Sequence, residues 1–235
     1  MRERGSTIAI AWGGAAIFAA SQLWFLYCYY IRFDRLPRSE LGIAEATAIN
    51  VSLFTVFALH HSVFARLAPK RFMERLVTPE LERSIYTWIA SVLFIAVCTA
   101  WRPVPGTLYR LDPPWRYAAD AVQILGIILT LRASRALGVL ELAGVRRAQP
   151  KASTTTELRT TGLYGFVRHP LYFAWTLLVF GTPDMTATRF VFAFVSTFNL
   201  ALAVPWEERG LVATFGRDYE RYRQSVRWRM IPGVY

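Results

Sequence analysis

Two long uncharged blocks constrain the fold of this chain more than any other feature of its sequence. Residues 6–31 and residues 84–101 hold no charged side chain. Apolar runs of about 18 or more residues are long enough to cross the hydrocarbon core of a membrane as a helix. Over the 235 residues, 54% are hydrophobic and 18% are charged, whereas soluble domains are about 25% charged. We therefore expect an integral membrane protein.

The distribution of apolar residues predicts five to six transmembrane helices. Asp120 and Gln123 interrupt the fourth segment, and the fifth is short enough to be re-entrant. A turn at Thr182-Pro183-Asp184 would join the fifth and sixth segments as a hairpin. The expected segments cover residues 6–31, 44–65, 84–101, 115–133, 170–182 and 189–206.

Basic residues are unevenly distributed between the expected loops. Of the 27 Lys and Arg residues, 20 fall in the two termini and in segments 66–83 and 132–169, all on one side of the membrane. Cytoplasmic loops are enriched in Lys and Arg, so both termini are expected in the cytoplasm, as in a bacterial inner membrane protein. The net charge of +11 then reflects topology and contact with anionic lipids. Because the basic residues are dispersed, nucleic acid is not an expected partner.

These patterns are typical of an all-α, polytopic membrane helix bundle with a cytoplasmic C-terminal helical cap. We expect a single domain over residues 1–235, in which residues 1–135 form the N-terminal transmembrane helices and residues 136–235 form the cofactor-binding core. Cys28 and Cys98 lie inside expected spans. They are expected to be packing residues and not parts of a disulfide framework.

Polar and aromatic residues collect between Thr160 and Tyr172. Pro170 suits the first turn of a helix, where its missing N–H has no cost. Arg168 and His169 would then lie at the mouth of a span, beside its unpaired N–H groups, where an anion such as a carboxylate is favoured. The alternative is a basic and aromatic anchor at the membrane interface.

Two adjacent carboxylates, Glu207 and Glu208, directly follow a long apolar run. Acidic residues at the end of a span are costly unless they are paired or face a polar cavity, so they are candidates for function. A solvated helix end with Arg209 as the partner is the structural alternative. Further along, Tyr219 and Tyr222 lie three residues apart, which predicts one shared helix face.

Together these groups could bind charges of both signs. A carboxylate pair with tyrosine faces suits a cation, and an Arg-His corner suits a carboxylate. S-adenosylmethionine carries a sulfonium, an ammonium and a carboxylate, so it matches this set. The sequence lacks a strand–Gly-x-Gly-x-x-Gly–helix pattern, which disfavours a soluble dinucleotide-binding enzyme. With three histidines and no Cys or Asp cluster, a metal site is not expected.

The motifs from residue 160 onward resemble those of the isoprenylcysteine carboxyl methyltransferase and phospholipid methyltransferase superfamily. In the order of that superfamily, the chain contains Gly162-Leu163-Tyr164, Arg168-His169-Pro170-Leu171-Tyr172, Glu207-Glu208, Phe215-Gly216 and Tyr219–Tyr222. The resemblance implies a membrane methyltransferase that binds S-adenosylmethionine among its last helices. The residues that it implies at the cofactor are Gly162, Tyr164, Val167, His169, Pro170, Tyr172, Glu207 and Glu208.

The N-terminal half is similar to the NnrU-like branch, which includes membrane methanethiol S-methyltransferases. Arg227 stands where the superfamily usually has a proline, and Leu211 where an acidic residue is common in the branch. These two departures affect the prediction of the methyl acceptor more than the prediction of the cofactor. The segments that carry the similarity are His61–Arg66, Lys70, Glu82–Tyr86, Trp101–Pro103, Glu141–Arg146 and Thr182–Thr186.

The expected reaction is methyl transfer to a small thiol such as methanethiol or hydrogen sulfide. Arg168 and Glu208 are the expected catalytic residues of the C-terminal core, and His61 is the expected participant from the N-terminal half. His60 is expected to point elsewhere, since neighbours on a helix diverge by about 100°. A thiol is mostly protonated at neutral pH, and a nearby sulfonium and Arg168 would favour the thiolate.

Three other interpretations remain open. The acceptor could be lipophilic, as for a carboxyl or phospholipid methyltransferase. The ending Arg229–Tyr235 is similar to that of sterol-reductase-type NADPH oxidoreductases, although a carboxylate pair disfavours a 2′-phosphate. A transporter or lipid-binding protein would distribute its polar residues through the spans. The sequence determines neither the acceptor nor the oligomeric state.

Overall fold

The computed structural model of the chain describes residues 2–37, 40–64, 79–137, 145 and 158–235. Within these residues, five helices are long and apolar enough to cross a membrane, which confirms the expected all-α polytopic bundle. These five are Thr7–Arg35, Ile43–Ser62, Leu81–Ala100, Trp115–Arg135 and Ala187–Phe215. Some residues named in the sequence analysis lie outside the described part of the chain. They are the motif residues 65–66, 70, 141–144 and 146, most of the basic segment 66–83 and half of the basic segment 132–169.

The chain forms two compact units. Unit 1 comprises Met1–Pro105 with Leu137–Ser153, and unit 2 comprises Gly106–Ala136 with Thr154–Tyr235. The fourth expected span, residues 115–133, lies in unit 2.

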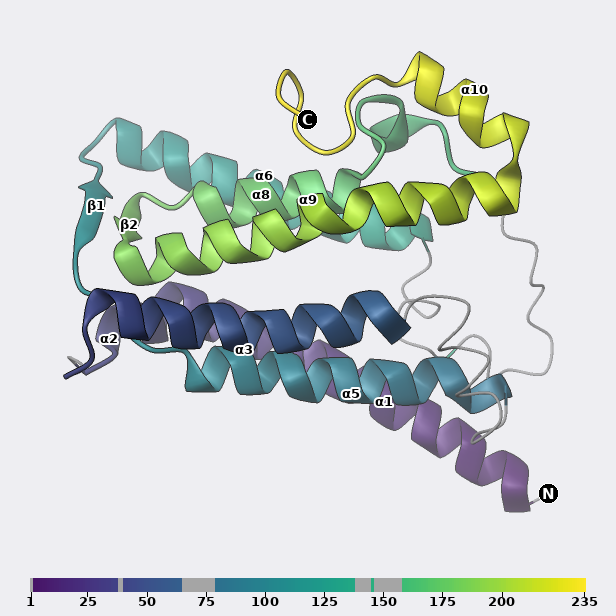
Figure 1. The fold of residues 1–235 in the computed structure, drawn as a ribbon, viewed down its shortest axis with the longest axis horizontal. Helices are drawn as coiled ribbons and strands as arrows, with labels where there is room; N and C mark the ends of the chain where they lie inside the picture. The colour runs from purple at the N-terminus through teal and green to yellow at the C-terminus, as the bar shows by residue number, and fades with distance from the viewer. Residues whose placement is uncertain (1, 38–39, 65–78, 138–144, 146–157) are drawn as a thin grey trace. The chain divides into compact units, whose positions relative to one another are not determined.

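Unit 1 is built on helix α5 (Pro79–Ala100), which packs against α1 (Arg2–Tyr27) and α3 (Ile43–Phe64). Helix α1 continues through a π-helical turn, Cys28–Arg32, into the short α2 (Phe33–Arg35), which is labelled in Figure 1. The guanidinium of Arg32 donates to the carbonyls of residues 98 and 99 at 3.0 and 2.8 Å. It thus satisfies two of the four carbonyls that the end of α5 leaves without helical partners.

Unit 2 consists of three helices that lie alongside one another, a small sheet and a C-terminal cap (Figure 1). Strands β1 and β2 pair antiparallel, with Thr107 opposite Thr186. This short sheet was not expected from the sequence. The elements in chain order are β1 (Thr107–Arg110), α6 (Trp115–Leu137), the 3-10 helix η3 (Gly162–Gly165), α8 (Pro170–Phe180), β2 (Asp184–Thr186), α9 (Ala187–Phe215) and α10 (Arg217–Ser225).

Helices α6 and α8 approach each other backbone to backbone. A Cβ added to Gly126 would lie 2.6 Å from the amide nitrogen of Leu178, so only glycine fits at this crossing. One turn earlier, the buried Gln123 donates to the carbonyl of Leu178 at 3.0 Å. The polar residue that interrupts the fourth span therefore joins two helices, as polar side chains do in membrane bundles.

The fifth segment and the sixth differ from their expected lengths. Helix α8 has 11 residues, or about 16 Å at 1.5 Å per residue, which is too short to cross a core of about 30 Å alone. Helix α9 is longer than expected, since it continues beyond residue 206 to Phe215. Its last turns remain helical because Leu211, Val212 and Phe215 pack against tyrosines of α10. The two carboxylates consequently lie within a helix and not after its end.

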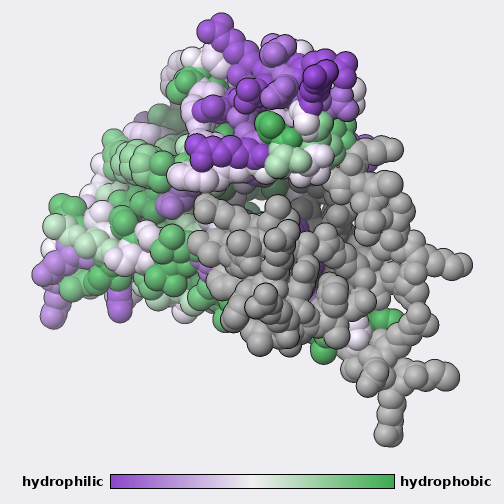
Figure 2. Space-filling model, turned by 45° about the vertical axis from the view of Figure 1, so that its right-hand side comes forward, coloured by the Kyte–Doolittle hydropathy of each residue, from purple (hydrophilic) through white to green (hydrophobic). Residues whose placement is uncertain are grey.

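The surface of unit 2 has apolar and polar regions. Phe190, Phe194, Phe198 and Leu202 recur every four residues along α9, and all are exposed. Such a stripe is typical of a helix in contact with lipid or with other apolar helices. Figure 2 shows hydrophilic side chains gathered over α10 and the chain that follows it, at the top of the view.

Candidate functional site

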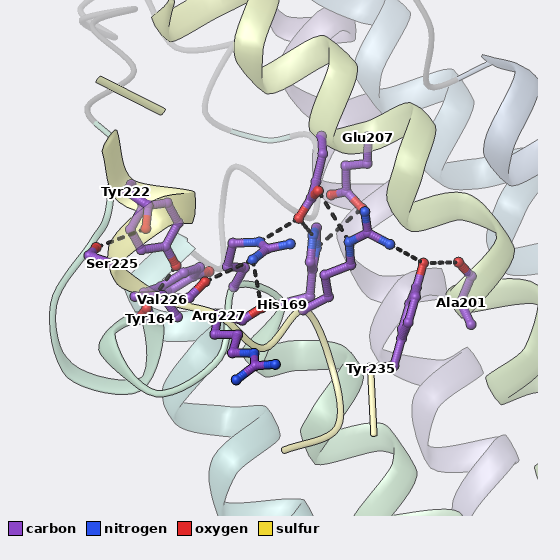
Figure 3. A network of polar contacts seen from close by, with 12 residues as sticks. Tyr164, His169, Ala201, Glu207, Tyr222, Ser225, Val226, Arg227 and Tyr235 are labelled. Atoms are coloured by element: carbon purple, nitrogen blue, oxygen red, sulfur yellow. Dashed lines mark hydrogen bonds and ion pairs between the residues drawn. The ribbon is translucent and has the colours of Figure 1, made fainter. Parts of the chain in front are cut away.

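Three segments of unit 2 meet at the end where α8 begins. They are the start of α8, the last turns of α9 and the C-terminal tail, residues 226–235, and Figure 3 shows their polar side chains converging. Pro170 occupies the first turn of α8, as expected, with His169 as its N-cap residue. The amides of Arg168 and His169 donate to the carbonyls of Trp228 and Arg229 at 2.9 and 2.8 Å. The tail is thereby held against the start of α8.

Arg168 and Glu208 form a buried ion pair at the centre of this site. The Nε of Arg168 lies 2.6 Å from the Oε1 of Glu208, and the two side chains are 7% and 6% exposed. The Nη1 of Arg168 also donates to the carbonyls of Val226 and Arg227, at 2.8 and 2.9 Å. A buried ion pair is tolerated only when further hydrogen bonds satisfy its groups. Here the guanidinium connects all three segments.

His169 lies between the two carboxylates. Its Nε2 is 3.5 Å from Glu208 Oε1, and its Nδ1 is 3.6 Å from Glu207 Oε2. The Tyr172 ring stacks on the imidazole at 5.3 Å, and its hydroxyl donates to Glu207 Oε2 at 2.8 Å. The side chain of Glu207 is 45% exposed. Glu207 is therefore the accessible carboxylate of the pair, and Glu208 is the enclosed one.

Two residues of the tail belong to this site although the sequence interpretation missed them. The Nε of Arg229 lies 3.4 Å from Glu208 Oε2, so Glu208 has an arginine beside each oxygen. The Arg229 guanidinium lies 5.0 Å from the centre of the Tyr235 ring and donates to its hydroxyl at 3.0 Å. The only sequence signal was the arginine and tyrosine ending of the chain, which does not indicate a carboxylate partner.

The tyrosines of α10 share one buried face, as their spacing predicted. Tyr219 and Tyr222 are in edge-to-face contact, with ring centres 5.7 Å apart. The hydroxyl of Tyr222 donates to the Tyr164 carbonyl at 2.7 Å, so the cap is joined to the 3-10 helix η3. Burial, reinforced by the charge of Glu207, raises the pKa of Tyr164 to about 12. Burial also raises the pKa of Tyr219 and of Tyr222. All three phenols are thus hydrogen-bond donors at neutral pH and not bases.

Two buried polar atoms of the site lack a hydrogen-bond partner in the part of unit 2 that the structure describes. They are the hydroxyl of Tyr219 and the Nε2 of His169, which lies 3.5 Å from Glu208 Oε1 but does not have the geometry of a hydrogen bond to it. Buried polar groups in folded proteins are almost always hydrogen-bonded. Each of these atoms can therefore still form a hydrogen bond with a polar ligand or with water.

The remaining expected cofactor residues of unit 2 have roles in the local fold. Gly162 starts η3 with a φ of 65°, a left-handed conformation that glycine adopts without strain. Val167 is fully buried next to Arg168. Contact of Gly162 and Val167 with a cofactor remains a prediction.

His61, the expected participant from the N-terminal half, lies in unit 1. The hydroxyl of Tyr86 is 2.9 Å from its Nδ1. His60, which was expected to point elsewhere, contacts the same residue: the rings of His60 and His61 lie 5.6 and 5.8 Å from that of Tyr86. The Tyr86 ring stacks on one histidine while its hydroxyl reaches the next, so a single residue of α5 contacts both.

Comparison with known proteins places the chain among membrane methyltransferases. Residues 115–218 match the phospholipid methyltransferase family. The methanethiol S-methyltransferase of Mycobacterium tuberculosis is 34% identical over 223 residues, covering 88% of this chain and 91% of that protein. The enzyme of the same name from Crocosphaera subtropica is 34% identical over 194 residues, or 80% and 76% of the two chains.

A more distant similarity extends to a protein with another name. The Nurim homolog of Drosophila melanogaster is 25% identical over 181 residues, covering 71% of this chain and 70% of that protein. No solved structure matches the chain significantly.

Proposed function

Because this chain belongs to the membrane methyltransferase family that contains the methanethiol S-methyltransferases, we propose that it transfers a methyl group from S-adenosylmethionine to a small thiol. The acceptors that its relatives' names favour are methanethiol and chemically similar thiols such as hydrogen sulfide. The methyltransferase activity follows from family membership, and the donor and the acceptor are the proposal.

The observation that carries the proposal is the pairing of opposite charges around Glu208. An arginine beside each oxygen of Glu208 and the exposed carboxylate of Glu207 put both signs within one small site. S-adenosylmethionine has a zwitterionic amino-acid end and a sulfonium, so such a site supplies a counter-charge for each of its groups. The unsatisfied Nε2 of His169 and hydroxyl of Tyr219 add two hydrogen-bonding groups for a polar ligand.

The donor would supply an activated methyl group. The thiolate sulfur would form a bond to the methyl carbon as the bond from that carbon to the sulfonium sulfur breaks, and S-adenosylhomocysteine would leave as the thioether. The protein must align the acceptor, exclude water and accept the proton of the thiol. A free thiol with a pKa of about 8.5 is mostly protonated at neutral pH. We propose that Glu207 and Glu208 balance the positive charges of the site. His61, which is hydrogen-bonded to Tyr86, is the candidate acceptor of the thiol proton.

The membrane topology is part of the proposal. An excess of Lys and Arg on one side, 20 of 27, supports cytoplasmic termini in a bacterial inner membrane. Unit 2 would then have its polar cluster on the side where the donor is made. Accessibility of single cysteines introduced at residues 217 and 109 to a membrane-impermeant label would test this orientation.

Purified protein in detergent should bind S-adenosylmethionine saturably by calorimetry, and the labelled donor should methylate methanethiol. The acceptor panel includes hydrogen sulfide, a prenylcysteine and phosphatidylethanolamine, because these separate thiol, carboxyl and amine acceptors. NADPH is the matched control, since a sterol-reductase-type enzyme would be stabilised against heat by NADPH instead. Failure to bind S-adenosylmethionine would refute the donor, and methylation of the lipid alone would refute the thiol acceptor.

A further inference from the structure

Arg229 and Arg168 differ in how fully their guanidinium groups are engaged. Arg168 is 7% exposed and donates to Glu208 and to two tail carbonyls. The Arg229 side chain is 36% exposed. Within the described residues, its guanidinium donates one hydrogen bond, to the Tyr235 hydroxyl, and its Nε lies 3.4 Å from Glu208 Oε2. A guanidinium offers five N–H donors. Arg229 therefore has donors left for an incoming anion, whereas Arg168 is committed to the protein.

The position of Arg229 depends on a break in the hydrogen bonding of α9. Pro205 lies inside this helix and has no N–H, so the carbonyl four residues earlier, that of Ala201, loses its helical donor. The hydroxyl of Tyr235 donates to this carbonyl at 3.3 Å and accepts from Arg229 (Figure 3). Both hydrogen-bonding capacities of the phenol are used. Tyr235 thus anchors the Arg229 side chain to the helix that carries the two carboxylates.

We propose that Arg229, held by Tyr235, binds the amino-acid carboxylate of the methyl donor. This inference rests on the proposed function and reassigns the anion-binding role that the sequence interpretation gave to Arg168. Arg229 adjoins one oxygen of Glu208, and the accessible Glu207 precedes Glu208 in the chain. The site then offers a cation for the carboxylate of the donor and a carboxylate for its ammonium. Tyr235 is a positioning residue, since it acts through Arg229.

The test compares two ligands that differ only at the amino-acid end. S-adenosylhomocysteine has the carboxylate and the ammonium, and 5′-methylthioadenosine lacks both while keeping the adenosine and a thioether. Calorimetry on the full-length protein measures both affinities without requiring turnover. Arg229→Met should weaken S-adenosylhomocysteine binding by about 10-fold or more, as expected for a lost charge-assisted hydrogen bond. Its affinity for 5′-methylthioadenosine should stay within about 2-fold of wild type, because the retained groups do not contact Arg229.

Two variants and a control sharpen the test. Tyr235→Phe should show the same ligand selectivity with a smaller loss, because the arginine is retained but no longer anchored. Arg229→Lys keeps the charge and should recover part of the affinity for S-adenosylhomocysteine. If Arg229→Met does not fold, the two ligands are compared in Arg229→Lys instead. Arg227→Met is the matched control. The Arg227 side chain is exposed and lies 5.1 Å over the Trp228 ring, so neither affinity should change.

The possible failures are distinguishable. If Arg229→Met weakens both ligands equally, Arg229 has a structural role and the inference is wrong. Unchanged S-adenosylhomocysteine affinity in Arg229→Met and Arg229→Lys would also overturn it. If the wild-type protein binds neither ligand, the proposed donor site itself is refuted.

Discussion

The polar cluster of unit 2 and that of unit 1 are built on different physical principles. In unit 2, Arg168, Glu208 and Arg229 form a chain of ion pairs that crosses three segments. In unit 1, the Tyr86 ring contacts those of His60 and His61, and its hydroxyl lies 2.9 Å from the Nδ1 and 3.2 Å from the carbonyl oxygen of His61.

The difference indicates what each cluster can do. Charges enclosed in a low-dielectric site must be paired in advance, and such a preorganised site discriminates between charged ligands. A histidine hydrogen-bonded to a phenol has a ring nitrogen on each side, which suits the movement of a single proton. We therefore predict that unit 2 binds the donor and that unit 1 transfers the proton.

The largest expected effect tests the ion pairs of unit 2. Glu208→Ala leaves the buried Arg168 without its carboxylate, which typically costs about 3–5 kcal/mol of stability. We expect a marked fall in thermal stability and loss of detectable donor binding by calorimetry.

The matched control for Glu208→Ala is Asp218→Ala. Asp218 pairs with Arg221 on the exposed face of α10, where an ion pair contributes about 1 kcal/mol or less. A Glu208→Ala protein as stable as the control, with wild-type donor affinity, would show that the ion pair is dispensable.

The next prediction separates the two clusters. His61→Ala should lower turnover by about 100-fold, the scale of a lost general base, while donor affinity stays at the wild-type value. Calorimetry and methyl transfer to methanethiol, measured on the same preparation, provide the two readouts. His60→Ala is the control, because His60 stacks on the same Tyr86 ring. Equal losses in both variants would indicate that the unit 1 cluster only packs α3 against α5.

A smaller effect is expected at the accessible carboxylate. Glu207→Gln keeps an oxygen that can accept from Tyr172 but removes the charge. Because Glu207 is partly exposed, we expect donor affinity to fall by about 5-fold with little change in stability. An unchanged affinity for S-adenosylmethionine would remove Glu207 from the donor site.

The smallest effect concerns the tyrosine cap of unit 2. The pKa of Tyr164 rises from about 10 in an unfolded chain to about 12 in the folded protein. The unfolded chain therefore releases this proton first, and the contribution to stability that is present below pH 10 is lost as the pH rises towards 12. Melting temperatures of Tyr164→Phe should fall less steeply than those of wild type in this range. Parallel pH profiles would contradict the assignment.

Local features of the fold followed from the sequence because they depend on local composition. Pro170 begins α8 because a missing N–H has no cost in the first helical turn. Tyr219 and Tyr222 share a face because helical periodicity places residues three apart together. The extension of α9 to Phe215 was missed, since it depends on packing against α10, which no local window contains.

The candidate site was only partly predictable. Its carboxylates, His169 and Arg168 were identified from their clustering, but their partners were not. From the sequence, Arg168 was expected to bind the carboxylate of a ligand, whereas in the structure it pairs with Glu208. Arg229 and Tyr235 gave no usable signal, because a basic residue near a membrane surface is common in any such protein.

The sequence by itself determined that this chain crosses a membrane, because the free energy of moving side chains from water into lipid adds up over each continuous apolar run. It also determined that the chain belongs to a methyltransferase family, because the motifs are short stretches of consecutive residues. Only the tertiary structure decided which charges neutralise one another. Arg168 meets Glu208 across 40 positions and the carbonyl of Val226 across 58. Ionic interactions weaken with distance in space and not in sequence, so the pairing exists only once the start of α8, the end of α9 and the tail are folded together.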